Sequence, residues 1–232
     1  MSTVKVGSAR IDERGKASGG KAGDQKGGEL AEQAFYNHTK GWYCLRPYDS
    51  NIAERLAKAM KDACNNNHIG YDQSQRTTLI TQLKAIFPRG IADITTDVEC
   101  DCSSLIRACI LEATGRDVGN FTTANEKSVL IKSGLFYLKD FSYAEDLRLG
   151  DVLVTQTKGH TVLVTDAPKR TTYVYTATVT SYALTVRSGP GIDHKAVGYL
   201  HKGNKVIVSE ERGKWARIGT NQWVSNKFLK YV

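Results

Sequence analysis

The sequence contains no long hydrophobic run. No segment approaches the ~18 consecutive apolar residues of a membrane-spanning helix, and the N-terminus MSTVKVGSARIDERGKASGG lacks the apolar centre of a signal peptide. We therefore expect no membrane insertion and a protein that is made in the cytoplasm without an export signal. The length of 232 residues suits one domain of about 150 residues and a smaller second module.

Cysteine is scarce, and its number is odd. The five cysteines argue against a disulfide framework. VECDCSSLIRAC holds three of them, but only one residue separates Cys100 from Cys102, and no second Cys/His pair completes the spacing of a structural zinc site. A Cys-x-x-Cys motif is also absent, so redox chemistry is not indicated. We expect no metal and no cofactor.

The middle of the chain predicts helices first and strands after them. Ser50 is a plausible cap for the first helix, Gly115 suits a left-handed cap after the third, and Thr123 with Glu126 reads as a capping box for the fourth. Beyond Gly134 the apolar period changes to two, as in strands. The predicted elements are helices over 50–66, 73–86, 102–114 and 123–134 and strands over 151–156 and 160–166.

The two ends of the chain differ from this middle part. Residues 1–40 are rich in glycine and charge, and we expect a loop or an extended arm there. After a threonine-rich linker, 169–177, short β segments and turns over 178–232 predict a small barrel. Residues 172–232 hold nine Lys/Arg against three Asp/Glu, which is +6 of the net +8 and favours an anionic partner.

Cys102 is the best candidate for a reactive thiol. The start of a helix offers free N–H groups and a positive dipole end, both of which lower a thiol pKa, and only Cys102 of the three clustered cysteines has this position. His160 stands at the start of a predicted strand and is the best-placed histidine to take the thiol proton. Spacing alone leaves open that both residues are structural.

Several motifs resemble known cell-wall enzymes. DCSS before an apolar helix, then LRLGDVLV and GHTVLVTD, resembles the NlpC-type and CHAP-type cysteine peptidases. This resemblance implies Cys102 as nucleophile, His160 as base and an α+β, papain-like catalytic domain over 1–168. SARIDERGKASGGKAGDQKGGEL, GWYCLRP and IGYDQSQR are similar to a subgroup found in phage endolysins of Gram-positive hosts. ALTVRSGPG, KGNKVIV, GKWARI and WVSNKFL are similar to bacterial SH3-like wall-binding domains, which are small all-β barrels.

The resemblance implies a monomeric peptidoglycan hydrolase that cuts an amide bond of the cell wall. The bond lies either within the stem peptide (an endopeptidase) or between sugar and peptide (an amidase). Such an enzyme is made in the host cytoplasm, acts on the wall after release and binds peptidoglycan rather than nucleic acid. The alternative is a non-catalytic wall-binding protein with a degenerate peptidase domain. The presence of both Cys102 and His160 favours the enzyme.

The third polar residue of the family, which orients the imidazole, has no clear counterpart. Asp166 shares a strand face with His160, but six residues at ~3.3 Å place it ~20 Å away along a straight strand. Asp24 and Gln25 are alternatives if the arm folds across the cleft. Tyr71 resembles a family tyrosine that polarises the scissile carbonyl, and packing as a half-buried aromatic is the other interpretation.

Two further sets of residues are candidates for binding. The acidic side chains Asp12, Glu13 and Asp24 suggest a structural calcium ion, although their spacing does not reproduce a recognised oxygen-ligand loop. In the tail, Tyr182 and Arg187 are the candidates for contacts with the wall.

Overall fold

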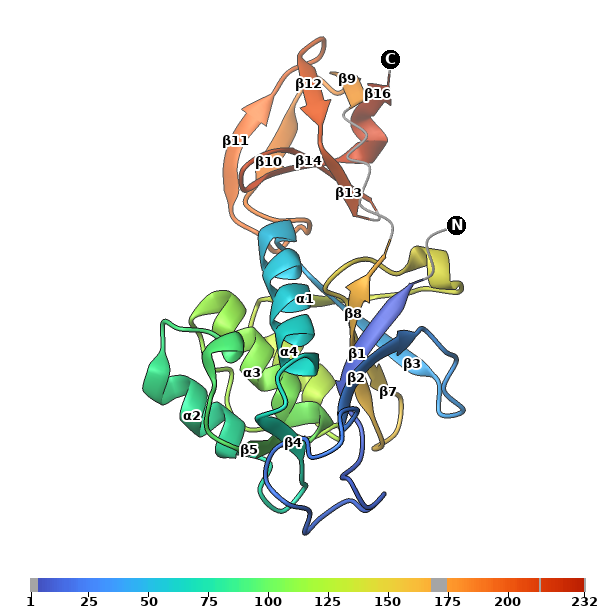
Figure 1. The fold of residues 1–232 in the computed structure, drawn as a ribbon. Coiled ribbons are helices and arrows are strands. Elements are labelled where there is room, and N and C mark those ends of the chain that lie inside the picture. The colour runs from blue at the N-terminus through green and yellow to red at the C-terminus, as the bar shows by residue number, and fades with distance from the viewer. Residues whose placement is uncertain (1–3, 168–174, 213, 232) are drawn as a thin grey trace. The chain divides into compact units, whose positions relative to one another are not determined.

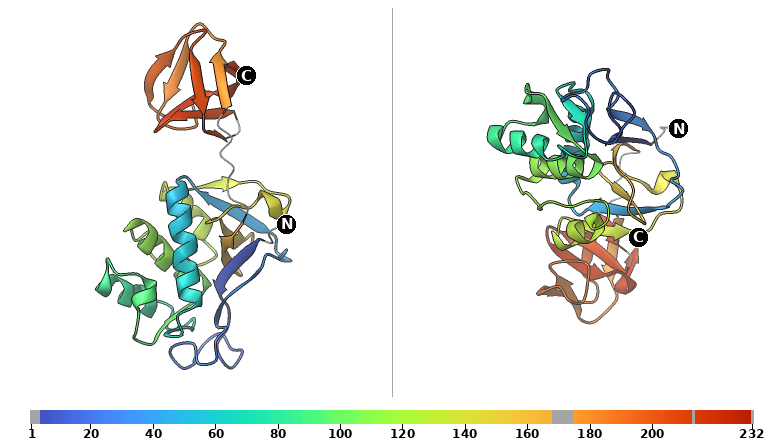
Figure 2. Two further views of the ribbon diagram at one scale, coloured as in Figure 1. Left: turned by 45° about the horizontal axis from the view of Figure 1, so that its top comes forward. Right: turned by 90° about the horizontal axis from the view of Figure 1, so that it is seen from below.

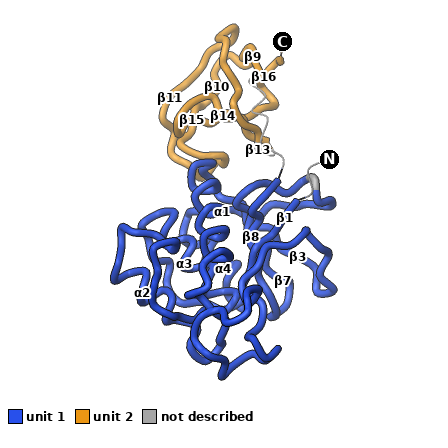
Figure 3. Tube along the Cα trace, in the orientation of Figure 1, with its two compact units in different colours: residues 1–169 blue, residues 170–232 orange. Residues whose placement is uncertain are grey.

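The computed structural model shows that the protein folds as two compact units. They comprise residues 1–169 and residues 170–232, coloured separately in Figure 3. The structure describes residues 4–167, 175–212 and 214–231. Most of the predicted linker, 169–177, therefore lies outside the described residues. Where description resumes, strand β9 begins at Tyr175.

The first unit is built on a six-stranded antiparallel sheet with the order β2-β1-β8-β7-β3-β6, and β4 and β5 form a separate parallel pair. The strands are β1 (Lys5–Ala9), β2 (Leu30–Ala34), β3 (Trp42–Pro47), β4 (Ile69–Tyr71), β5 (Val98–Cys100), β6 (Phe136–Lys139), β7 (Val152–Thr155) and β8 (Thr161–Asp166). The helices are α1 (Ser50–Cys64), α2 (Thr78–Ile86), α3 (Cys102–Thr114) and α4 (Glu126–Lys132), with short 3₁₀ turns at Ile91–Asp93 and Ala144–Asp146.

The main core lies between this sheet and helices α1 and α3. Helix α1 contacts α3 as well as β1 and β8, and Figure 1 shows it between the other helices and these strands. Leu56 and Met60 of α1, Ile106 of α3 and Leu163 of β8 are fully buried in one cluster. Each such side chain contributes ~1.5–3 kcal/mol by leaving water. This packing fixes the start of α3 relative to β8.

The helix ends follow local hydrogen bonds. Asp49, rather than the predicted Ser50, caps α1, because its carboxylate accepts the Asn51 N–H at 2.7 Å. Asp101 and Ser104 cap α3 reciprocally: the Asp101 carboxylate accepts the Ser104 N–H at 2.7 Å, and the Ser104 hydroxyl accepts the Asp101 N–H at 2.9 Å. Gly115 ends α3 with φ 69°, which confirms the predicted left-handed cap.

Helix α2 begins five residues later than the predicted start at 73. The Asp72 carboxylate accepts the N–H groups of Ser74 and Gln75, at 2.5 and 3.2 Å, and so holds this segment in a turn. The helix proper therefore starts at Thr78 and ends at Ile86, before Pro88.

The strands predicted over 151–156 and 160–166 are confirmed as β7 and β8. The Gly-Asp pair ahead of β7 has a structural role. The buried Asp151 carboxylate accepts bonds from Arg46 of β3, at 2.7 Å from Nε and 2.6 Å from Nη2. Gly150 has φ +79°, and a Cβ there would lie 2.5 Å from the Cα of Ala53. Only glycine fits this approach of the turn to α1.

The prediction of a loop over residues 1–40 is wrong at both of its ends. Val4 and Val6 alternate with polar neighbours, and β1 pairs with both β2 and β8, with Val6 opposite Val164. The segment reads as a loop in the sequence because β1 and β2 are short and stand far from β8 in the chain. The glycine-rich residues 10–29 do form a loop, at the bottom of the left view in Figure 2.

The second unit is all-β. Its two sheets have the orders β11-β10-β15-β14-β13 and β12-β9-β16, and apolar side chains such as Val179, Val186, Ala216 and Val224 fill the space within it. The strands are β9 (Tyr175–Val179), β10 (Leu184–Arg187), β11 (Ala196–Leu200), β12 (Lys205–Val208), β13 (Glu210–Arg212), β14 (Trp215–Gly219), β15 (Gln222–Ser225) and β16 (Leu229–Tyr231), with a 3₁₀ turn at Asn226–Phe228. Across the described ranges of both units, no helix is long and apolar enough to cross a membrane.

Candidate active site

Cys102 is the first residue of α3, and its side chain is only 8% exposed. Burial raises the pKa of its thiol to about 12, and the neighbouring carboxyls of Asp101 and Glu126 act in the same direction. The backbone N–H groups of Thr161 and Ser103 lower it. The helix start thus has the predicted effect on the thiol, but burial outweighs it. At neutral pH the resting thiol is protonated.

His160 stands between β7 and β8, and Thr155 holds its backbone on both sides. The His160 N–H donates to the Thr155 hydroxyl at 3.0 Å, and the His160 carbonyl accepts the Thr155 N–H at 3.0 Å. Burial lowers the pKa of the imidazole to about 4, with further lowering by the nearby His38 and Arg10. The resting imidazole is therefore neutral at pH 7.

Thr161 is the first residue of strand β8. It follows His160 directly, and its backbone N–H lowers the pKa of the Cys102 thiol. Its hydroxyl donates to the Glu126 carboxyl at 2.8 Å, and the Leu153 carbonyl is a second acceptor 3.0 Å from the same hydroxyl oxygen. The start of β8 therefore places, directly after His160, a residue whose backbone affects the Cys102 thiol.

Glu126 is not the capping-box residue that its spacing predicts. Helix α4 has Asn125 at its cap, without a side-chain bond. The Glu126 side chain instead turns inward, is 0% exposed and accepts the bond from Thr161. The contact with a residue 35 positions later replaces the local cap, because a buried carboxyl needs a partner more than an exposed helix start does.

We expect Glu126→Gln to stabilise the protein above pH 8. Burial raises the pKa of the Glu126 carboxyl to about 8. The folded state binds this proton more tightly than the unfolded state does. Its stabilising contribution is therefore complete below about pH 4.5 and is lost as the pH rises to about 8, at ~1.4 kcal/mol per pH unit. Glutamine stays neutral and still accepts the Thr161 bond.

The measurement is the free energy of unfolding by urea at pH 5 and at pH 9. Glu126→Gln should match the wild type at pH 5 and exceed it by roughly 2–4 kcal/mol at pH 9. Glu54→Gln on the exposed face of α1 is the matched control and should follow the wild type at both pH values. Parallel pH curves for Glu126→Gln and the wild type would show that this carboxyl is not the titrating group.

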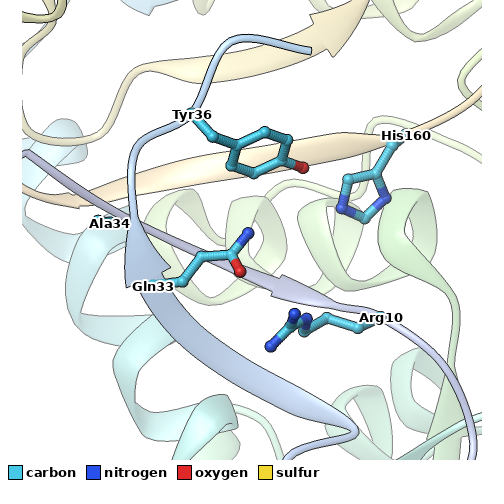
Figure 4. A pocket seen from close by; sticks show the side chains of 5 residues that line it. All are labelled: Arg10, Gln33, Ala34, Tyr36 and His160. Atoms are coloured by element: carbon cyan, nitrogen blue, oxygen red, sulfur yellow. The ribbon is translucent and has the colours of Figure 1, made fainter. Parts of the chain in front are cut away.

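The imidazole faces a cleft that the N-terminal segment helps to build. Arg10, Gln33, Ala34, Tyr36 and His160 line a cavity of about 500 Å³, and Figure 4 shows the four longer side chains directed toward one common space. Burial raises the pKa of the Tyr36 hydroxyl. The charge of Arg10 lowers this pKa, and Cys102 raises it. The predicted arm is thus one wall of the site.

No local pattern in the sequence predicts this wall. Arg10, Gln33 and Tyr36 carry no spacing relation to Cys102 or to His160. The pairing of β1 with β8 is what brings them to the cleft. Sequence reasoning also missed Arg76, which holds the turn before α3. Its guanidinium donates to the Asp101 carboxylate at 2.6 Å, to the Ser103 hydroxyl at 2.9 Å and to the Phe121 carbonyl at 2.6 Å.

The structure does not bring Asp166 to the imidazole, because it ends β8 opposite Lys5, at the far end of the strand from His160. Asp24 accepts four backbone N–H groups within 26–29, and Gln25 donates to the carbonyls of Ala22 and Gly23. Both alternatives are therefore engaged inside the glycine-rich loop. Among the described residues, no side chain is hydrogen-bonded to the His160 imidazole.

Tyr71 does lie close to the site. It ends β4 and stands opposite Cys100 in the parallel pair, two residues before Cys102. Burial raises the pKa of its hydroxyl, which is also affected by Cys102. That hydroxyl accepts a bond from Gln73 at 2.9 Å, so its own proton is available to a further acceptor.

The carboxylate oxygens of Asp12 accept hydrogen bonds from neighbouring residues of the N-terminal segment. Both Asp12 carboxylate oxygens accept bonds from Arg14, and one of them also accepts the Lys16 N–H. Over the ranges that the structure describes, no three His, Cys, Asp or Glu side chains are grouped so that they could hold a metal ion. The calcium site suggested by Asp12, Glu13 and Asp24 therefore has no support in this geometry.

The second unit exposes one of its two predicted contact residues. Tyr182 is 82% exposed, with the Lys202 ammonium 5.1 Å from its ring centroid. Arg187 is half-buried, and its guanidinium donates to the His194 carbonyl at 2.9 Å. Tyr182 is thus accessible from solvent, whereas Arg187 supports a turn of its own module.

Comparison with known families gives two matches that follow one another along the chain. A family model described as an endolysin-like domain matches residues 6–171. A model described as a bacterial SH3 domain matches residues 183–230. Neither the curated proteins nor the solved structures include a significant match.

Proposed function

Because the chain belongs to the endolysin-like domain family and carries a bacterial SH3 domain, we infer that it is a peptidoglycan-targeting endolysin. We propose that it hydrolyses a peptidoglycan amide bond with Cys102 as nucleophile and His160 as base. One observation carries this proposal. Cys102 begins α3, and the backbone N–H of Thr161, the residue next to a neutral histidine that faces a cleft, lowers the pKa of its thiol.

The electrostatics of the pair indicate general-base catalysis. Burial keeps both the thiol and the imidazole neutral at rest. The proton therefore moves to His160 as Cys102 attacks the amide carbonyl. The imidazolium then protonates the leaving amine, which leaves a thioester on the sulfur. His160 next deprotonates a water molecule, whose attack on the thioester releases the acid and restores the thiol.

Two groups are placed to stabilise the oxyanion. The N–H groups of Cys102 and Ser103 lie in the first turn of α3, where backbone donors have no partner within the helix. The Tyr71 hydroxyl accepts a bond from Gln73, so its own proton is available, and Tyr71 pairs with Cys100, two residues before Cys102. We propose that the amide N–H groups bind the oxyanion and that Tyr71 polarises the carbonyl.

The arrangement of α3 and β8 favours a papain-like catalytic unit of the NlpC or CHAP type. A nucleophile-bearing helix packs on an antiparallel sheet, and the strand that follows the histidine is central in it. One of the two strands beside β8 is β1, which comes from the N-terminal part of the chain; the other is β7. The same chemistry serves a stem-peptide endopeptidase and an N-acetylmuramoyl-L-alanine amidase.

The test of catalysis is the turbidity of purified Gram-positive cell walls after addition of the full-length protein. A hydrolase reduces the turbidity with time in proportion to protein concentration. A non-catalytic wall-binding protein, the alternative function, would sediment with the walls and leave the turbidity unchanged.

We further propose that the second unit tethers the enzyme to the wall, and we expect a fragment of residues 172–232 to sediment with walls by itself. It forms a compact unit with its own core and carries net +6. Surface charge is screened over ~8 Å at physiological salt, so part of the binding should fade as salt rises. Contacts through Tyr182 should persist, and Tyr182→Ala should remove that salt-resistant part.

The fragment of residues 1–168 is the counterpart in the same pull-down. It should stay in the supernatant at high salt, cleave soluble wall fragments and act more slowly on intact cells, because it lacks the local concentration that the tether supplies. Residues 172–232 remaining in the supernatant at low salt, while 1–168 pellets, would reverse the proposed division of roles.

A further inference from the structure

Arg10 is an arginine without a partner at the mouth of the cleft. It follows β1 directly, and its backbone N–H donates to the Glu29 carbonyl at 2.7 Å. Its side chain is exposed and makes no ion pair or hydrogen bond with any residue in the described part of the chain. Four other arginines of this unit are paired with aspartates: Arg14 with Asp12, Arg46 with Asp151, Arg76 with Asp101 and Arg107 with Asp117.

The cleft around Arg10 suits an anion. Its lining contains a guanidinium, the Gln33 amide, the Tyr36 hydroxyl and the His160 imidazole, but no carboxylate. Arginine presents two parallel N–H groups that match the two oxygens of a carboxylate. The cavity of about 500 Å³ is within the size range of sites for small ligands.

Arg10 is also close to the reacting groups. Its charge contributes to the low pKa of His160. It also partly offsets the rise in the pKa of Tyr36 that burial and Cys102 cause. Figure 4 shows the Arg10 side chain below the His160 ring, with its guanidinium extended toward the side of Gln33. A group bound by Arg10 therefore lies in the same cleft as the His160 imidazole.

We propose that Arg10 determines substrate specificity by binding a free carboxylate on the peptide part of the substrate, beside the scissile amide. This inference rests on the proposed function. Peptidoglycan stem peptides present such carboxylates, and amidation converts them to carboxamides. Arg10 therefore makes the enzyme selective for non-amidated stems.

The test uses two synthetic N-acetylmuramoyl stem peptides, which contain both candidate bonds and differ only in one group, the α-carboxylate or the α-carboxamide of the isoglutamyl residue. For the wild type, kcat/KM should be at least about tenfold higher on the carboxylate, the ratio expected for a hydrogen-bonded charge pair. Arg10→Gln should hydrolyse both peptides at similar, low kcat/KM. Arg10→Lys keeps the charge without the fork and should show a reduced ratio. Arg89→Gln, an exposed arginine far from the cleft lining, is the matched control and should keep the wild-type ratio.

The outcomes separate this inference from the proposed function. Hydrolysis of both peptides with equal kcat/KM by the wild type, or an unchanged ratio in Arg10→Gln, overturns the role of Arg10 and leaves the hydrolase intact. If Arg10→Gln fails to fold, Arg10→Lys decides, and an unchanged ratio in it overturns the role. Absence of hydrolysis of either peptide by the wild type overturns the proposed function and the inference with it.

Discussion

Cys102→Ala is expected to abolish wall lysis, with a loss of at least about a thousandfold, while the protein stays folded and bound to walls. Removing a catalytic nucleophile costs this much or more, because no weaker route of the same chemistry remains. The other clustered thiols cannot replace it, since Cys100 and Cys109 are fully buried. The measurement is the initial rate of turbidity loss, together with sedimentation of the variant with the walls.

Cys100→Ala is the matched control for this substitution. The Cys100 thiol donates to the Gly70 carbonyl at 3.5 Å inside the core. Its removal should cost on the order of 1–2 kcal/mol of stability and leave the lytic rate near that of the wild type. Near-normal lysis by Cys102→Ala, with lysis lost in Cys100→Ala, would show that the wrong cysteine has been assigned.

His160→Ala is expected to reduce kcat/KM by at least about a hundredfold, the usual worth of a general base. In the wild type, the imidazole must be neutral to accept the thiol proton. Because the pKa of His160 is lowered to about 4, kcat/KM should be lost only as the pH falls through about 4. The alkylation rate of Cys102 should show the same acid limb, and His160→Ala should lack it.

His68→Ala is the control, because the exposed His68 ring pairs with Asp97 at 2.7 Å and does not line the cleft. It should leave the rate and the pH profile unchanged. An acid limb near pH 6.5 in the wild type would indicate a solvated imidazole rather than the buried one seen here. Activity lost in His68→Ala but kept in His160→Ala would overturn the assignment of the base.

Features of the site that depend on local sequence were predictable. The cap at Asp101 and the left-handed Gly115 bracket α3, so the position of Cys102 at a helix start follows from its neighbours. The period of two identified β7 and β8, and with them the place of His160. These signals act over a few residues, which is why a single sequence carries them.

Features that depend on distant pairings were not predictable. Arg10 and Tyr36 reach the cleft only because β1 pairs with β8, across more than 150 residues of chain. The inward turn of Glu126 likewise depends on Thr161. The thiol pKa was predicted to be low from the helix start alone, and the structure shows it raised, because the burial of Cys102 arises from tertiary packing.

The chemistry of the new chain ends tests the central claim most directly. Purified Gram-positive walls are digested with the wild type and with Cys102→Ala, and the soluble fragments are identified by mass spectrometry. A cysteine-dependent amide hydrolase releases fragments with paired new amino and carboxyl ends, placed either within the stem peptide or at the sugar–peptide junction, and Cys102→Ala releases none. New reducing sugar ends, or the same amide fragments from Cys102→Ala, would contradict this account.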